Sequence, residues 1–414
     1  MRKSQPDIVI DGTECISAKP SGIGHYALGI TSGLDALSED GILSYSILLR
    51  KKTADHLKHL PLDNLSRKYT FGSLRRNIAH QIVKRKLGIT MDSLLPKGAY
   101  YFPAFHALPM RSRTSAVVVH DMAYRDIPEC VTQYHVDRLT RTLANTVSSV
   151  GNVIAVSEFT KERILHYFDI DPDRIYVAPP AVDRELYRPM ETKRAELIRK
   201  KYGVECGQYI LSVGNLEPRK NLVSLIKAFS TLPASVLKDF SLVLVGADGW
   251  NKEELERCIH EATSLGVAIV RPNAFVADED MPAFYSGAHG FAFVPLYEGF
   301  GMPTLEAYAC GVPVLATRVP SLREQGSRES AALFVERPHD IEEIAAGLLQ
   351  LVSINANERA GKRIAMEQHL SGFSWKRSAL VTARAVLGES ASDTLRTYQE
   401  ATANPLNAAT CVMA

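Results

Sequence analysis

Short, almost wholly apolar runs alternate with amphipathic segments along most of the chain. In the first half, the apolar runs lie at residues 8–10, 45–49, 100–102, 117–119, 153–156 and 174–177. Between them, apolar residues recur at helical spacing, as at Tyr26, Ile30 and Leu34 and over about 134–147. Short apolar strands that alternate with helices are typical of a parallel, doubly wound sheet, which binds its ligands at the carboxyl ends of the strands.

The same alternation restarts after a Pro-Pro pair at 179–180. The strands expected there lie at 209–213, 241–245, 267–270, 291–294, 313–316 and 332–335, and the later helices at 341–352, 358–369 and 375–386. Consecutive prolines interrupt regular structure, and 414 residues exceed what one core usually holds. We therefore predict an α/β domain over 1–180, a linker over 181–205, a second α/β domain over 206–373, a helix over 374–388 and a loosely ordered tail over 389–414.

Composition and charge are ordinary for a globular protein, with 46% hydrophobic residues, 23% charged residues and a net charge of +2. The six cysteines are scattered, which argues against a zinc site or a disulfide framework and fits a reducing compartment. The sequence begins without an apolar run of signal-peptide length and nowhere approaches a membrane span. We expect a cytoplasmic protein with no metal site and no nucleic-acid partner.

The segment EGFGMPTLEAYACGVPV predicts a strand, a glycine-containing turn and a helix that begins near Pro303. The backbone N–H groups of Gly301 to Thr304, together with the helix dipole, favour a phosphate. Glu298 in the turn and Glu306 in the helix flank this place, separated by seven residues. Carboxylates only accept hydrogen bonds, so they suit the hydroxyl-rich sugar and ribose of a sugar nucleotide.

Three further groups follow predicted strands. Arg219 and Lys220 begin a helix, where cations oppose the dipole unless an anion lies between; Arg binds a phosphate bidentately and Lys as a point charge. Gly22 and Gly24 allow a close approach of backbone to phosphate or form a plain tight turn. His120 stands at the mouth of the sheet, where its side chain can bind a ligand; Asp121 beside it can equally be a cap.

A basic stretch over 67–86 carries no acidic residue among its Lys and Arg side chains. Leu74, Ile78, Ile82 and Leu87 recur at roughly helical spacing, which predicts an amphipathic basic helix. Such a helix suits an anionic membrane surface or a lipid-linked acceptor, and it equally fits a solvated helix packed on the sheet. The first of these two possibilities would bring the protein to the cytoplasmic face of the inner membrane.

The segment from Glu298 to Glu306 and its surroundings closely resemble the signature of the family 4 retaining glycosyltransferases, which have the GT-B architecture of two Rossmann-like lobes facing a cleft. GNLEPRKN at 214–221 resembles the same family, and HDMAYRDIPE at 120–129 looks most like bacterial mannosyltransferases of surface polysaccharide assembly. The resemblance implies that the last helix crosses back to the first lobe.

The resemblance also implies roles for individual residues. The glycine loop at Gly22 and Gly24 would close over the donor pyrophosphate, although His25 stands where relatives often carry Arg. His120 would face the donor sugar, and the backbone at Phe275 and Val276 would hold the base. The remaining donor-binding positions are Arg219, Lys220, Gly299, Phe300, Gly301, Met302, Pro303, Thr304 and Glu306, with Glu298 and His120 as the catalytic residues.

These observations predict a metal-independent, retaining glycosyltransferase without a cofactor, whose donor is a nucleotide diphosphate sugar. GDP-mannose is the first expectation for the donor, and a glycan or lipid-linked glycan of polysaccharide or lipopolysaccharide synthesis for the acceptor. A nucleotide-sugar epimerase or a sugar phosphorylase on the same architecture is an alternative enzyme. A non-catalytic nucleotide-sugar-binding protein is an alternative of another class.

Overall fold

A computed structural model describes residues 7–15, 20–50, 62–71, 95–108, 110, 114–324, 330–388, 395 and 398. The chain divides into two compact units. The first contains Met1–Met122, Asp137–Pro180 and Ser374–Ala414, and the second contains Ala123–Val136 and Ala181–Phe373. The stretch 181–205, predicted as a linker, is thus part of the second unit, and it contains helix α6 (Thr192–Lys201).

The first unit is built on a seven-stranded sheet in the order β3-β2-β1-β4-β5-β6-β7, with every neighbouring pair parallel. The strands are β1 (Asp7–Asp11), β2 (Ser44–Arg50), β3 (Arg67–Phe71), β4 (Ala99–Phe102), β5 (Ser115–Val119), β6 (Asn152–Ala155) and β7 (Ile175–Val177). All residues of β4 and β5 are buried. This burial on both faces explains why these strands are recognisable as unbroken apolar runs.

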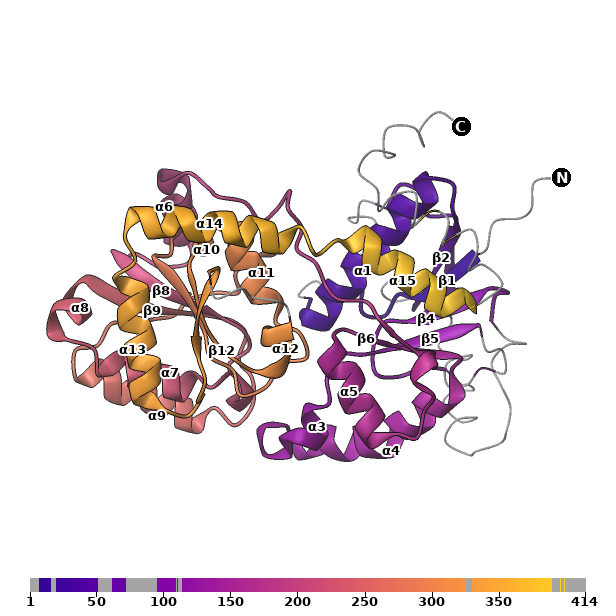
Figure 1. Ribbon diagram of the computed structural model, residues 1–414, viewed down its shortest axis with the longest axis horizontal. Coiled ribbons are helices and arrows are strands. Elements are labelled where there is room, and N and C mark those ends of the chain that lie inside the picture. Colours follow the sequence, from indigo (N-terminus) through magenta and orange to yellow (C-terminus); the bar gives the residue numbers. More distant parts are fainter. Residues whose placement is uncertain are drawn as a thin grey trace. The chain divides into compact units, whose positions relative to one another are not determined.

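Helices cover both faces of this sheet. Helix α1 (Gly22–Glu39) packs against α15 (Trp375–Leu387) on one face, and α5 (Glu158–Tyr167) lies on the other (Figure 1). Most of α4 (Gln133–Ser149) and all of η4 (Pro172–Arg174) also belong to this unit, whereas α3 (Ala123–Asp126) and η3 (Pro128–Cys130) belong to the second unit. The final helix therefore belongs to the first unit although it comes last in the chain.

Strand β3 corrects one expectation, because residues 67–71 are a strand and not the start of a basic helix. Positions 72–94, which hold the rest of the expected amphipathic helix, lie outside the described residues. Most of the expected tail also lies outside them. Its described residues Leu395 and Tyr398 are helical, and Leu395 is buried.

The second unit is built on a six-stranded parallel sheet in the order β10-β9-β8-β11-β12-β13. Its strands are β8 (Gln208–Val213), β9 (Phe240–Val245), β10 (Ile269–Val270), β11 (Gly290–Phe293), β12 (Val314–Thr317) and β13 (Ala332–Val335). The helical segments are α6, η5 (Pro218–Lys220), α7 (Leu222–Ser230), α8 (Ala234–Asp239), α9 (Glu253–Ser264), η6 (Asp278–Asp280), α10 (Met281–Gly287), α11 (Met302–Ala309), α12 (Pro320–Glu324), α13 (Ile341–Val352) and α14 (Ala356–Leu370).

The helices of this unit form two layers. α7 contacts α9 and α13 in one layer, and α10 contacts α6 and α11 in the other, where α14 also packs on α11 (Figure 1). The core between the first layer and the sheet is aliphatic, with Leu225, Ile226 and Leu348 fully buried. The predicted doubly wound α/β fold is thus confirmed for both units.

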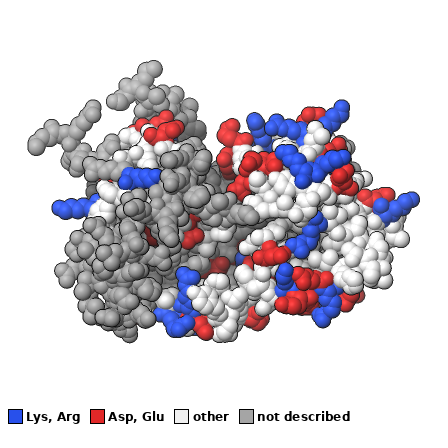
Figure 2. Space-filling view, turned by 180° about the vertical axis from the view of Figure 1, so that it is seen from behind, with Lys and Arg blue, Asp and Glu red and all other residues white. Residues whose placement is uncertain are grey.

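Surface charge in the second unit is mixed in sign, since acidic and basic side chains are interspersed over the face shown in Figure 2. Within the described ranges, no helix combines the length and the hydropathy needed to cross a membrane.

The close packing of α1 on α15 predicts a strong effect of one methyl group. A Cβ at Gly33 would lie 2.4 Å from the Trp375 carbonyl oxygen and 2.7 Å from the Ala379 Cβ. We expect Gly33→Ala to destabilise the first unit by about 1–3 kcal/mol despite the better helix propensity of alanine. Thermal unfolding followed by circular dichroism should show a Tm lower by roughly 2–4 °C for each kcal/mol.

The control is Gly361→Ala in the exposed part of α14, where a Cβ meets no atom within 4 Å. Helix propensity alone should then leave stability unchanged or raise it by up to about 1 kcal/mol. Equal Tm changes in the two variants would contradict the proposed packing constraint.

Candidate functional site

The carboxyl ends of two neighbouring strands in the second unit carry the charged residues of the candidate site. β8 leads to Arg219 and Lys220 in η5, and the adjacent strand β11 leads to Glu298. Asn221 ends η5 in the left-handed conformation, with φ of 57°. Its side-chain amide donates to the carbonyl oxygens of Val294, at 3.0 Å, and Pro338, at 2.6 Å. Asn221 therefore connects the segment after β8 with the loops after β11 and β13.

The charged side chains form one ion-pair network, in which two half-buried cations surround the buried carboxylate of Glu298. Arg219 Nη1 lies 3.1 Å from Glu298 Oε2, and Lys220 Nζ pairs with Glu298 Oε1. The Lys220 ammonium also lies 5.2 Å from the centre of the Phe293 ring. Room for the lysine stem depends on Gly214, where a Cβ would lie 3.2 Å from Lys220 Cε and φ is 149°. Two cations thus hold one buried carboxylate between them.

The network keeps Glu298 ionised. Burial alone would raise the pKa of this carboxyl, but the charges of Arg219 and Lys220 and their hydrogen bonds outweigh burial and lower its pKa. Glu298 is only 7% exposed, and a buried charge is stable only when it is paired and hydrogen-bonded. Glu298 is therefore a fixed anion that can accept from sugar hydroxyls or stabilise positive charge.

The turn between Glu298 and α11 passes through a glycine directly into the helix start. Gly301 adopts φ of 98°, a conformation that favours glycine, and α11 begins at the next residue. Thr304 Oγ1 donates to the Gly301 carbonyl at 2.7 Å, while Met302 and Pro303 are half-buried. Gly299 and Phe300 are buried. Helix α11 and its first backbone N–H groups thus follow Glu298 closely in the sequence.

Glu306 lies one turn into α11 and accepts a 2.6 Å hydrogen bond from the Tyr285 hydroxyl. Burial and the nearby Glu306 charge raise the pKa of Tyr285, so its phenol stays protonated and acts as the donor. Phe275 is 41% exposed, and Val276 beside it is buried, just before η6. The second unit contains all of these predicted site residues: Arg219, Lys220, Phe275, Val276, Glu298 and Glu306.

His120 follows β5 in the first unit and is half-buried. Its Nε2 lies 2.7 Å from the Pro103 carbonyl oxygen, and its ring contacts Tyr26 and Phe105 edge-on. Burial lowers the pKa of His120 more than Pro103 and Asp121 raise it. Because a carbonyl only accepts, Nε2 carries the proton, and Nδ1 of the neutral ring is an acceptor.

Gly22 and Gly24 differ from their predicted place in a loop, because they form the first turn of α1. The Ser21 side chain caps this helix by accepting from the Gly24 backbone N–H at 3.4 Å. A Cβ at Gly24 would lie 2.9 Å from the Pro20 Cβ and 3.3 Å from the Glu14 carbonyl oxygen. Gly24 therefore serves close packing at the helix start.

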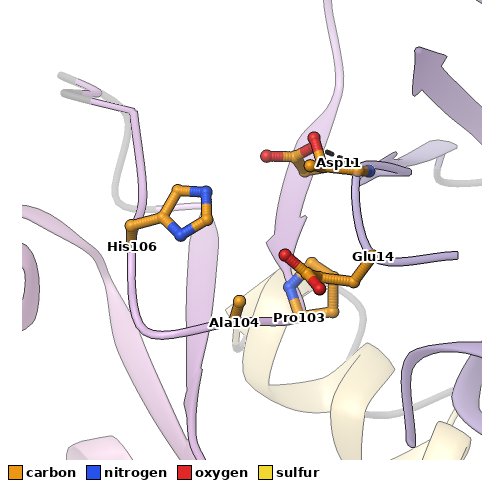
Figure 3. A pocket seen from close by; sticks show the side chains of 6 residues that line it. Asp11, Glu14, Pro103, Ala104 and His106 are labelled. Carbon is orange, nitrogen blue, oxygen red and sulfur yellow. Dashed lines mark hydrogen bonds between the residues drawn. The ribbon is translucent and has the colours of Figure 1, made fainter. Parts of the chain in front are cut away.

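A shallow pocket, whose lining includes Asp11, Glu14 and His106, lies at the carboxyl edge of the first unit's sheet, where β1 and β4 are parallel neighbours. Thr13 donates to Asp11 Oδ1 through its backbone N–H, at 3.1 Å, and through its hydroxyl, at 2.6 Å. Figure 3 shows Asp11 and Glu14 facing the pocket opposite His106. The wall also includes Pro103, whose carbonyl accepts from His120. The backbone at Pro103 thus lines the pocket and also holds the His120 ring.

Sequence reasoning missed Glu217, Tyr285 and this pocket. Glu217 stands within the GNLEPRKN segment, two residues before Arg219, and that position was the available signal. Tyr285 is separated from Glu306 by a strand, and Asp11 from His106 by three strands. No local spacing indicates such pairs.

Two doubly wound parallel-sheet units, with charged residues at the strand ends, define an α/β protein of the GT-B class. Sucrose-phosphate synthase from Thermosynechococcus elongatus matches with a TM-score of 0.66 and 17% identity, covering 96% of this chain and 99% of that one. Anabaena HepE in complex with UDP-glucose matches with a TM-score of 0.64 and 16% identity, covering 95% and 100%. These likenesses show the fold.

Sequence comparison gives the family. Residues 194–366 match the model "Glycosyl transferases group 1". The chain is 31% identical over 289 residues to the O-antigen chain mannosyltransferase B of Escherichia coli, covering 69% of this chain and 73% of that protein. The protein belongs to the group 1 glycosyl transferases, and the predicted resemblance to glycosyltransferases is confirmed.

The depressed pKa of Glu298 predicts a pH-dependent contribution to stability. Its folded-state pKa lies below the ordinary value of 4.5, so its stabilising effect is fully present above that pH and is lost as the pH falls through the folded pKa. Glu298→Gln should cost roughly 1–3 kcal/mol near pH 7, because the half-buried Lys220 loses its carboxylate partner while Arg219 keeps Glu217. The Tm difference from the unmodified protein, measured from pH 7 downward, should shrink below pH 4.5.

Glu256→Gln is the control, since Glu256 pairs with Lys252 at an exposed site. Exposed pairs contribute about 0–1 kcal/mol. A Glu298→Gln penalty that stays constant down to the acid unfolding limit would contradict the assignment.

Proposed function

We propose that the protein is a retaining, metal-independent glycosyltransferase of family 4 that transfers mannose from GDP-mannose to a glycan or lipid-linked glycan. The observation that carries this proposal is the Arg219–Glu298–Lys220 network next to the start of α11 in a group 1 domain. Mannose as the sugar and polysaccharide or lipopolysaccharide synthesis as the process are supported by the likeness to an O-antigen chain mannosyltransferase. A lipid-linked acceptor would place the reaction at the cytoplasmic face of the inner membrane.

The donor would be held from both ends. The N–H groups at the start of α11 and the cations Arg219 and Lys220 would take the diphosphate, whose charge they neutralise as it leaves. Glu306, already oriented by Tyr285, would accept from the ribose hydroxyls. The backbone at Phe275 and Val276 would hold the base. No metal ion is needed in this scheme, because these donors supply the positive charge.

Glu298 and His120 would act on the donor sugar. The ionised Glu298 would accept from sugar hydroxyls and stabilise the positive charge that develops on the ring. Nδ1 of His120 would accept a further hydroxyl hydrogen bond. Same-face attack balances the reaction: the sugar–phosphate bond breaks, the acceptor oxygen bonds to the same face of the anomeric carbon, and its proton passes to the leaving phosphate. The alternative covalent route would require Glu298 itself as nucleophile.

Donor binding tests the function. A panel of nucleotide sugars should raise the Tm selectively for GDP-mannose, because a ligand at 100 times its dissociation constant adds about 2.7 kcal/mol. Lys220→Ala should abolish the shift and sugar transfer, and Glu306→Ala should weaken both. NMR of the product should show the anomeric configuration of the donor. Sugar transfer that survives Lys220→Ala would contradict the site assignment.

The same panel separates the alternatives. A nucleotide-sugar epimerase would change the sugar without an acceptor and release no nucleotide. A non-catalytic binding protein would be stabilised by a donor but would neither release nucleotide nor alter the sugar. Both outcomes would contradict the transferase proposal.

For the acceptor, we propose contacts with the half-buried side chains Asp11, Glu14 and His106 at the surface of the shallow pocket. Its carboxylates only accept, which favours the hydroxyls of a neutral sugar over a phosphate group. Glu14→Ala and His106→Ala should raise the acceptor KM about tenfold, as expected for a lost hydrogen bond to a charged or polar group, and leave the donor KM unchanged. Initial rates measured against each substrate provide the test.

Glu162→Gln, at an exposed position of α5 in the same unit, is the control and should change neither KM. If the pocket variants alter the donor KM as strongly as the acceptor KM, the acceptor assignment is wrong.

A further inference from the structure

Glu217 is a buried carboxylate to which the proposed mechanism gives no role. It directly precedes η5 and is 5% exposed. Its Oε1 accepts two hydrogen bonds from Arg219, one from Nη2 at 2.8 Å and one from Nε at 3.2 Å. A carboxylate at this depth must be matched by a cation, and Arg219 is the cation that its contacts identify.

The contacts on the opposite side of Arg219 define its orientation. Nη1 donates to the Tyr297 carbonyl at 3.1 Å and lies 3.1 Å from Glu298 Oε2. Glu217 therefore grips the Nε–Nη2 edge while Nη1 reaches the Glu298 loop. Because the guanidinium is planar and rigid, contacts at two edges fix its plane.

The four side chains Glu217, Arg219, Lys220 and Glu298 carry two formal negative and two formal positive charges. Without Glu217, the contacts of Arg219 with Tyr297 and Glu298 would both lie on one side, and the guanidinium could move with the Glu298 carboxylate. With Glu217 in place, Arg219 is held at a defined distance from Glu298, whose other oxygen pairs with Lys220. The position of the sugar-binding carboxylate thus depends on a residue two positions before the arginine.

We infer that Glu217 is a positioning residue, which orients Arg219 and through it Glu298. This inference rests on the proposed function of Glu298 and Arg219 in donor binding. Glu217 does not contact the donor in this scheme. Its effect reaches the reaction through the Arg219 guanidinium.

Two substitutions separate geometry from charge. Both hydrogen bonds from Arg219 end on the single oxygen Oε1, so Glu217→Gln can keep both acceptor contacts while it removes the negative charge. Glu217→Ala removes both. We expect Glu217→Ala to lower kcat/KM for the donor roughly 10–100-fold, the range found for partners that orient a ligand-binding group, and Glu217→Gln to retain most of it.

The pH profile supplies a readout that a purely structural residue would not change. Removing the negative charge at 217 leaves Arg219 more strongly attracted to Glu298, which lowers the pKa of Glu298 further. The acid limb of kcat/KM should therefore move to lower pH in Glu217→Gln. Glu254→Gln, at an exposed site facing Lys227, is the matched control and should leave the profile in place.

Three results would overturn the inference: equal losses of kcat/KM in the Ala and Gln variants, an unchanged acid limb in Glu217→Gln, or a Glu217→Ala variant that loses Tm but keeps kcat/KM. If the unmodified protein transfers no sugar from any donor, the proposed function fails on its own. In that case the coupling of Glu217 to Glu298 through Arg219 can still be tested without an activity assay, by measuring how Tm depends on pH in the acid range. That dependence should move to lower pH in Glu217→Gln and stay in place in Glu254→Gln.

Discussion

The pairing of one buried carboxylate with two cations is the interaction on which the candidate site depends. Glu298 has no low-energy state in a buried loop unless Arg219 and Lys220 accompany it, and these cations come from another strand end. These ion pairs therefore hold the loops after β8 and β11 together. Asn221 adds a neutral hydrogen bond between the same two loops, through Val294, and a second one to Pro338 in the loop after β13. Charge and backbone geometry thus specify one arrangement of the two loops.

Glycine supplies the space that this arrangement needs. Gly214 lets the Lys220 stem pass, and Gly301 turns the chain so that α11 starts beyond Glu298. Neither position could hold a side chain without strain at its positive φ. The backbone conformation at these two glycines therefore determines where the charged side chains of the site lie.

The fold was predictable because most strands are buried on both faces and read as apolar runs, as at β5 and β8. β3 was misassigned because its residues, RKYTF, are partly charged at the edge of the sheet. The Glu298–Glu306 segment was recognisable because a strand, a glycine turn and a helix start follow one another in the chain. The Tyr285 partner of Glu306 was not, since the two residues meet only through the folded sheet, and the Glu217–Arg219 pair is local but its residue types alone do not indicate the contact.

The charge balance of the network has a consequence for how a diphosphate can be bound. Four groups whose formal charges cancel offer no net attraction to an anion, so long-range steering is not what they contribute. In the proposed function, binding would instead exchange partners: donor hydroxyls would share the Glu298 carboxylate with the two cations, and part of the positive charge that Glu298 neutralises would become available to phosphate oxygens. A donor that lacks either the sugar or the diphosphate would drive only half of this exchange. The ligand-free ion pairs would therefore favour an intact nucleotide sugar.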